Sequence, residues 1–206
     1  MKRVGIGQIS FDIDGVLANF TRGFTKLGNK LFGTPVGSES NQQSWNFEEF
    51  PELQLTKERI DAMWRIAWDD PWFWAMLDPL NTSVMSQINR ISNRIFITNR
   101  LGIDAKKQSE YFLWKWGIDT PKVFLASDKV PVAVRQMVVA HIDDNMANCV
   151  ALKTALPDAY IAMLWTSYNQ RHHAEWTALG GPIVLSVEQF IEEVERRQLA
   201  LPRIGL

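Results

Sequence analysis

Short apolar runs alternate with amphipathic stretches along most of the chain. The apolar runs have the length of β-strands and end at polar residues, which favours strands. They cover Ile9 to Ile13, Ile95 to Ile97, Lys122 to Leu125, Val138 to Ile142 and Tyr160 to Leu164. Helical spacing follows over Thr82 to Ser92, Ala105 to Trp116, Val130 to Gln136, Asn145 to Leu156, and from Ser186 to about Arg197. This alternation predicts an α/β fold with a doubly wound parallel sheet and helices on both faces.

Residues 18–79 interrupt the alternation with a segment of mostly helical character. Two helical stretches, Phe20 to Phe32 and Thr56 to Trp68, flank a loop rich in Gly, Ser, Asn and Gln at Gly33 to Ser44. Because this segment follows the first strand and precedes the rest of the sheet, it reads as an insertion. We therefore predict a core formed by residues 1–17 and 80–206, and a helical insert formed by residues 18–79.

Composition excludes several classes of function. The 206 residues include 22 basic and 23 acidic ones, and no basic block suggests binding to a nucleic acid polymer. Cys149 is the only cysteine, so an internal disulfide and a thiolate zinc cluster are both excluded, which suits a reducing compartment. The chain shows neither an apolar leader at its start nor a run of about 18 apolar residues. We expect a cytoplasmic protein without a membrane partner.

Polar residues follow the predicted strands at the edge where ligands bind in parallel sheets. They are Asp12 and Asp14 after the first strand, Thr98 after the second, Lys129 shortly after the third, and Asp143 with Asp144 after the fourth. Because the carboxyl ends of parallel strands lie at the same edge, these side chains are expected to converge there.

Asp12 and Asp14 are the most informative pair. Residues i and i+2 of an extended segment project to one side, where two carboxylates repel each other unless a cation lies between them. Gly15 then allows a sharp turn. Taken alone, the same pattern is also common in an ordinary turn after a strand. The pair suits a Mg²⁺ site that includes a nucleophilic carboxylate.

The remaining strand-end residues strengthen that interpretation when they are taken together. The hydroxyl of Thr98 is suited to binding a phosphate oxygen, and Lys129 to neutralising a phosphate or a carboxylate. The adjacent carboxylates of Asp143 and Asp144 call for a cation or a role beside a phosphate. Each signal is weak by itself, since strand-end threonines and solvated lysines are common.

In this order along the chain, the four features resemble the haloacid dehalogenase-like hydrolases. The resemblance implies that Asp12 attacks phosphorus and becomes an aspartyl phosphate, while Asp14 acts as general acid and then as general base. It implies that Thr98 and Lys129 hold the phosphoryl group. It also implies that Mg²⁺ is bound by Asp12, by the main-chain oxygen of Asp14 and by Asp143, with Asp144 as a ligand or a neighbour of the ligands.

Several segments are similar, more narrowly, to the 5′(3′)-deoxyribonucleotidases. They are the stretch from Asp12 to Phe20, the aromatic run WDDPWFWAMLDPL from Trp68 to Leu80, Ser127-Asp128-Lys129, and LWTSYNQ from Leu164 to Gln170. The similarity is loose over Gly33 to Ser44 and after Gly180. It implies that the insert is a helical cap whose aromatic residues hold the nucleotide base.

The cap aromatics matched in this way are Phe20, Trp45 and Trp68, which are expected to bind substrate. Five of the nine tryptophans lie between Trp45 and Trp74, and a tryptophan cluster of this kind also suits a subdomain core. Asn99 and Arg100 depart from the family, which carries a small hydroxyl residue and a proline after the threonine. Both are expected near the phosphate, where Arg100 adds a cation that bears on substrate choice.

The sequence therefore predicts a Mg²⁺-dependent phosphatase of the 5′-nucleotidase kind that acts on a nucleoside monophosphate. Two alternatives remain open at this point. One is a phosphatase for another small phosphomonoester, such as a sugar phosphate. The other is a non-catalytic regulator that binds nucleotides. The resemblance also suggests a homodimer.

Overall fold

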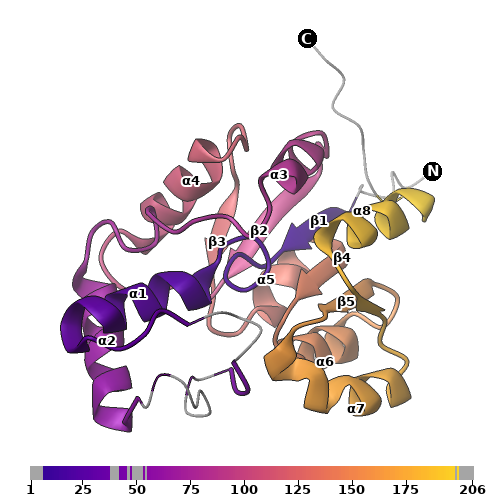
Figure 1. The fold of residues 1–206 in the computed structure, drawn as a ribbon. Helices are drawn as coiled ribbons and strands as arrows, with labels where there is room; N and C mark the ends of the chain where they lie inside the picture. The colour runs from indigo at the N-terminus through magenta and orange to yellow at the C-terminus, as the bar shows by residue number, and fades with distance from the viewer. Residues whose placement is uncertain are drawn as a thin grey trace.

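The computed structural model describes residues 7–37, 42–45, 47, 53, 55–197 and 199. Within them, six parallel strands form one sheet in the order β3-β2-β1-β4-β5-β6 (Figure 1). The strands are β1 (Gln8–Phe11), β2 (Arg94–Thr98), β3 (Val123–Leu125), β4 (Val138–Asp143), β5 (Tyr160–Leu164) and β6 (Ile183–Val184). The chain winds outward through β2 and β3 on one side of β1, and through β4, β5 and β6 on the other.

Helices cover both faces of this sheet. One face carries α3 (Thr82–Asn89), α4 (Ala105–Lys115) and α8 (Val187–Arg196), whose buried side chains share one core with the strands. The other face carries α5 (Val130–Arg135), α6 (Met146–Ala155) and α7 (His173–Ala178), which contribute to a second core. A short 3-10 helix, η2 (Ser167–His172), leads into α7. The doubly wound α/β fold predicted from the sequence is confirmed.

The alternation of side chains along each strand explains the two cores. On β2, Phe96 belongs to the core beneath α3, α4 and α8, while Ile95 and Ile97 belong to the core on the opposite face. Strands buried on both faces read as continuous apolar runs, which is typical of parallel sheets. This is why the strands were visible in the sequence as short unbroken runs.

The two helices of the predicted insert lie together beyond the end of the sheet and not on one of its faces (Figure 1). They are α1 (Phe20–Phe32) and α2 (Lys57–Asp69). A third apolar cluster holds them together and contains Phe24, Phe47, Leu53, Ile60 and Met63. Asn19 and Thr56 accept hydrogen bonds from backbone N–H groups of the first turns of α1 and α2 and thereby cap them.

The predicted elements agree with the structure to within a few residues. The helix predicted over Thr82 to Ser92 is shorter, because α3 ends at Asn89 and Ile91 turns into the core ahead of β2. Neither β6, η2 nor α7 was predicted, because two to six residues are too few for a periodic pattern to show. Part of the loop predicted at Gly33 to Ser44, residues 38–41, lies outside the described residues. The division at residues 17 and 79 stays a prediction.

Among the residues that the structure describes, no helix is both long and apolar enough to cross a membrane.

Candidate active site

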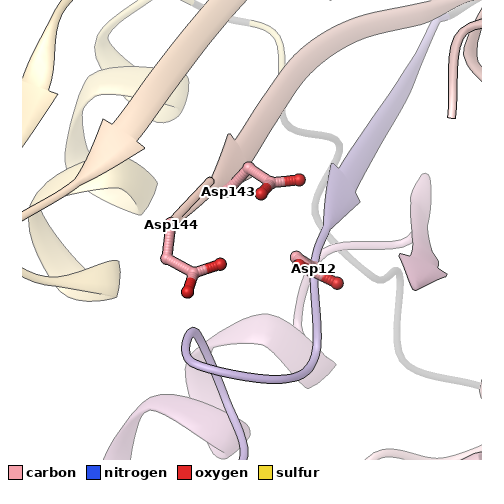
Figure 2. A group of neighbouring side chains, drawn as sticks. All are labelled: Asp12, Asp143 and Asp144. Atoms are coloured by element: carbon pink, nitrogen blue, oxygen red, sulfur yellow. The ribbon is translucent and has the colours of Figure 1, made fainter. Parts of the chain in front are cut away.

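The site lies where the sheet changes its winding direction. The strands β1 and β4 are neighbours, with Phe11 paired to Ile142, although the chain forms β2 and β3 between them. Ligands of doubly wound sheets bind at such a switch point, beyond the carboxyl ends of the strands. Asp12 follows β1, and Asp143 and Asp144 stand at the end of β4, with their carboxyl groups gathered between the two strand ends (Figure 2).

These three carboxylates could hold a metal ion. One oxygen from each of Asp12, Asp143 and Asp144 lies within 4.8 Å of the others, and all three residues are buried. Oxygen ligands are those that Mg²⁺ prefers, and one or two carboxylates with water and phosphate complete its usual shell. The structure thus brings together the acidic residues that the sequence placed at two separate strand ends.

The turn after β1 sets the position of Asp12. Its Oδ1 accepts a hydrogen bond of 2.7 Å from the N–H of Ile13. Gly15 has a φ of 73°, in the left-handed region that favours glycine. A Cβ at Gly15 would collide with the carboxylate of Asp144 and lie 2.7 Å from the hydroxyl of Tyr168. Glycine is therefore required here both for the turn and for the close approach of the two strand ends.

Lys129 lies between two of the carboxylates. Its Nζ is 2.9 Å from Asp12 Oδ2 and 2.6 Å from Asp143 Oδ2, and its side chain is buried. Asp143 accepts further hydrogen bonds from the backbone N–H of Asn145, from the side-chain amide of Asn148 and from the ring of His141. Asp143 is thereby held from several sides. Asp144, by contrast, lines the cavity in front of the strands and accepts a hydrogen bond from Tyr168.

The electrostatics of this cluster favour the binding of a cation. Burial raises the pKa of Asp12 to about 7, and the charges of Asp143 and Asp14 add to the rise, although Lys129 opposes it. Burial, with the charges of Asp143 and Asp12, also raises the pKa of Asp144 well above its ordinary value. One lysine thus compensates the cluster only in part, and a divalent cation fits the donor set.

The contact between Asp143 and Lys129 favours the ionised form of both side chains. Burial opposes ionisation of Asp143, but Lys129 and His141 outweigh it and hold the pKa of Asp143 well below its ordinary value. Burial likewise opposes the charge on Lys129, but the neighbouring Asp12 and Asp143 raise its pKa. Lys129 is therefore a permanent cation beside Asp12.

A cavity of about 250 Å³ opens in front of these residues. Its polar floor includes Asp12, Asp14, Thr98, Lys129 and Asp144. The hydroxyl of Thr98 is buried and has no hydrogen-bond partner among the described residues. A buried polar group without a partner costs free energy, so this hydroxyl is suited to donating to a ligand. Asn99 and Asn148 line the same cavity.

The opposite wall of the cavity is aromatic and comes from the insert. Phe20 and Trp45 line it as expected from the sequence, together with Trp64 and Trp74, which the sequence did not single out. The ring of Phe20 stacks on Trp64 at 5.3 Å and on Trp74 at 5.8 Å. Trp68 does not line this cavity; its ring packs against Trp64 at 5.9 Å. Trp64 and Trp68 share one helix face, and the sequence spacing could not tell which of them faces the site.

Trp45 is half exposed and lines the cavity. It belongs to the segment 42–45, which is hydrogen-bonded to α1 on one side and to η2 on the other. Gln42 accepts a hydrogen bond of 2.6 Å from Thr21 on α1 and donates one of 2.7 Å to the carbonyl of Ser44. Ser167 donates a hydrogen bond of 3.0 Å to the carbonyl of Gln42. Nothing in the sequence pattern pointed to Gln42, because its partners lie on two distant elements.

Arg100 is placed differently from the substrate-side position expected from the sequence. Its Nε and Nη2 donate to the two carboxylate oxygens of Asp14 at 2.9 and 2.7 Å, and its Nη1 donates to Ser109 at 3.2 Å. The guanidinium also lies over the rings of Trp74 and Phe112. Arg100 is fully buried and does not line the cavity, so its contact in the site is with Asp14 and not with the space for substrate.

Comparisons with known proteins indicate the family and agree with the fold. Residues 6–179 match the model of a family described as 5′ nucleotidase, deoxy (pyrimidine), cytosolic type C protein. A solved structure named as a haloacid dehalogenase-like hydrolase from Burkholderia xenovorans is similar in fold, with a TM-score of 0.52 and 13% sequence identity. That similarity covers 89% of this chain and 96% of the other. No curated protein sequence matches this chain.

Proposed function

Because the chain belongs to the family of 5′ nucleotidase, deoxy (pyrimidine), cytosolic type C proteins, we propose that it hydrolyses nucleoside monophosphates, deoxyribonucleotides among them. Family membership makes it a phosphatase of the nucleotidase kind. The observation that carries the proposal is the buried hydroxyl of Thr98, which has no hydrogen-bond partner in the part of the chain that the structure describes and lines the same cavity as Asp12 and Lys129. A hydroxyl donor, a fixed cation and a carboxylate together suit a phosphoryl group.

In the proposed first step, a carboxylate oxygen of Asp12 attacks phosphorus. The bond between phosphorus and the leaving oxygen breaks, and Asp14 supplies the proton that this oxygen takes up. Thr98 and Lys129 bind the other phosphoryl oxygens and hold the group in line. Phosphoryl transfer depends mainly on positioning and on neutralising charge, which is what these residues offer.

In the proposed second step, water replaces the nucleoside. Asp14 takes a proton from the water as it attacks phosphorus, and the bond between phosphorus and Asp12 breaks. Free phosphate leaves, and Asp12 is regenerated as a carboxylate. Splitting the displacement in two is the general advantage of a covalent nucleophile.

We propose Mg²⁺ as the cofactor, held by Asp12, by the main-chain oxygen of Asp14 and by Asp143 and Asp144. Asp144, directly after β4, lines the cavity, while Asp143, the last residue of β4, accepts hydrogen bonds from several sides. The ion supplies positive charge to the phosphoryl oxygens when it is bound. The raised pKa values of Asp12 and Asp144, caused first by burial and then by neighbouring carboxylates, support this assignment, because a bound cation favours the charged form of both groups.

The aromatic wall supports a nucleotide substrate. Phe20 and Trp45 line the cavity, and Trp64 and Trp74 extend the same aromatic surface. Stacking of a base on an aromatic ring contributes roughly 1–3 kcal/mol. Trp68, which was expected to stack, contributes through its packing on Trp64. A purely polar substrate would leave this wall unused.

The chemistry is tested by phosphate release from an aryl phosphate. We expect release with Mg²⁺ and none with EDTA, and we expect Asp12→Asn to abolish turnover while the protein stays folded. A mutant that kept the wild-type rate would rule out the covalent mechanism.

The substrate is tested by a panel of nucleoside monophosphates and sugar phosphates. We expect a preference for nucleotides that Trp45→Ala weakens, with little change in hydrolysis of the aryl phosphate. Trp68→Ala should have a smaller effect, and Trp72→Ala is the control, because Trp72 is exposed and lies outside the cavity. Equal rates across the panel would favour the rival function, a phosphatase for other small phosphomonoesters.

Two further features belong to the proposal. A cytoplasmic location is supported by the family's description as cytosolic. A homodimer rests on the resemblance noted in the sequence, and sedimentation of the purified protein tests it.

A further inference from the structure

A polar pair lies one layer beneath the site, inside the sheet. Ser10 lies on β1 two residues before Asp12, which follows the strand, and His141 lies on β4 two residues before Asp143. Residues two apart in an extended segment project to the same face. The register of the two strands places Ser10 opposite His141. Both side chains are fully buried. Both residues are polar in strands whose neighbouring side chains are mostly apolar.

His141 links the two layers through its two ring nitrogens. Its Nδ1 lies 2.7 Å from the hydroxyl oxygen of Ser10, and its Nε2 lies 3.0 Å from Asp143 Oδ2. A lone pair on Nε2 would face the lone pairs of the carboxylate, so the hydrogen must be on Nε2. The Ser10 hydroxyl then donates to Nδ1, in preference to the carbonyl of Ala140 at 3.2 Å.

Asp143 contacts both His141 and Lys129 through the same carboxylate oxygen. The oxygen that accepts from His141 is the same Oδ2 that lies 2.6 Å from Lys129 Nζ. The same Nζ is 2.9 Å from Asp12, the proposed nucleophile. A rotation of the Asp143 carboxylate would therefore move the ammonium group away from Asp12 and from the phosphoryl site. Neighbours of this kind, which orient the groups in contact with a ligand, commonly affect activity strongly.

We propose that His141 is a positioning residue whose Nε2–H fixes the Asp143 carboxylate and thereby holds the ammonium of Lys129 beside Asp12. The inference rests on the proposed function, because it assigns His141 a part in the same reaction.

Two amide substitutions of different length distinguish the contact of His141 with Asp143 from its contact with Ser10. In His141→Gln the longer side chain can bring an amide N–H to the place of Nε2 and donate to Asp143. In His141→Asn the amide reaches only the place of Nδ1, so it can satisfy Ser10 but not Asp143. His141→Leu removes both contacts. Unfolding temperatures of all three variants show how much of any effect is a loss of stability.

We expect kcat to fall by about 10- to 100-fold in His141→Asn and His141→Leu, the usual range for such orienting neighbours. His141→Gln should recover most of the loss, although its unfolding temperature is expected to be close to that of His141→Asn. If His141→Asn is as active as His141→Gln, or if His141→Leu keeps the wild-type kcat, the inference is wrong.

A spectroscopic measurement tests the same contact without turnover and without metal. Nitrogen NMR of the histidine ring in the metal-free protein should show a hydrogen on Nε2 of His141. Asp143→Asn should change that signal, because an amide can replace the carboxylate oxygen with a donor. A hydrogen on Nδ1 alone would overturn the inference whatever the enzyme does. Wild-type protein that releases no phosphate from any substrate would instead overturn the proposed function.

Discussion

At the scale of single residues, the site depends on buried charges that contact one another. Lys129 and Arg100 are both fully buried, and each lies against a carboxylate that follows β1. Removing one partner of a buried ion pair leaves an uncompensated charge, which is more harmful than the pair itself is stabilising. Substitutions at these residues should therefore affect both stability and activity, and the two effects have to be measured separately.

Arg100→Lys tests whether Arg100 acts on Asp14 or on the substrate. Lysine keeps the charge but cannot contact both oxygens of a carboxylate. We expect kcat to fall roughly tenfold or more, because the hydrogen bond that lysine cannot replace, of about 1.5–3 kcal/mol, holds the proposed acid and base Asp14 in place. We expect the KM for a nucleotide to change little, because Arg100 does not line the cavity. Steady-state kinetics measure kcat and KM separately. Arg90→Lys, at an exposed position, is the control. A change confined to KM would instead indicate that Arg100 binds the substrate, as the sequence predicted.

The raised pKa of Asp12 predicts how stability depends on pH in the metal-free protein. The folded state holds the Asp12 proton up to about pH 7, whereas the ordinary pKa is 3.8. This group therefore stabilises the folded state fully below its ordinary pKa, and the contribution is lost as the pH rises through about 7. His141, with its lowered pKa, changes stability in the opposite direction near its ordinary value.

The comparison of wild type with Asp12→Asn isolates the Asp12 contribution. Between about pH 5 and about pH 7.5, we expect the mutant to gain stability relative to wild type, because it cannot ionise. Urea unfolding in EDTA at both pH values measures the difference. Asp158→Asn, at an exposed position, should show no such change. A constant difference between mutant and wild type would contradict the prediction.

At the scale of elements, the turn between β1 and α1 does most to shape the site. It carries Asp12 and Asp14, and the N-cap Asn19 begins α1 directly after it. Backbone N–H groups of Leu17 and Ala18 both donate to the carbonyl of Ile13 at 2.8 Å, which closes the turn. The acidic cluster is thus formed by one tight turn after β1 together with the end of β4.

Two glycines with similar backbone angles test what this turn requires. Gly15 has a φ of 73° and Gly33 a φ of 69°, but only a Cβ at Gly15 would meet other atoms. Gly33→Ala should cost only the left-handed backbone, about 1–2 kcal/mol, and keep full activity. Gly15→Ala should cost more and lose activity, because the new methyl group displaces Asp144. Thermal unfolding and phosphate release measure both, and equal effects would show that crowding at Gly15 is unimportant.

At the scale of the whole molecule, the sheet order matters most. It joins β1 and β4 as neighbours, so that acidic residues from distant parts of the chain share one space (Figure 1). The insert then places an aromatic wall opposite that space. Folding therefore works against the repulsion of these carboxylates, and a ligand that relieves it stabilises the whole fold.

Mg²⁺ should raise the unfolding temperature of the entire protein. A ligand that binds only the folded state adds about 2.7 kcal/mol at one hundred times its dissociation constant. We expect this rise in wild type and a much smaller one in Asp144→Asn. Calorimetry with Mg²⁺ or with EDTA measures it, and sodium chloride of matched ionic strength is the control. An equal rise in the mutant would place the ion elsewhere.

Much of the fold could be predicted from the sequence because its signals are local. The strand Tyr160–Leu164 and the helix Phe20–Phe32 have the bounds that their patterns indicated. The strand-end residues Asp12, Thr98 and Asp143 could be recognised for the same reason, since each follows an apolar run. Short elements such as β6 carried too few residues for any period to appear.

The sequence by itself determined the type and order of the elements and the polar groups at the strand ends, because neighbours along the chain fix both. Only the tertiary structure decided that Arg100 contacts Asp14, that Trp64 and not Trp68 lines the cavity, and that His141 lies behind Asp143. These contacts join residues on different elements. Their geometry depends on how whole side chains pack, and no spacing along one segment encodes that.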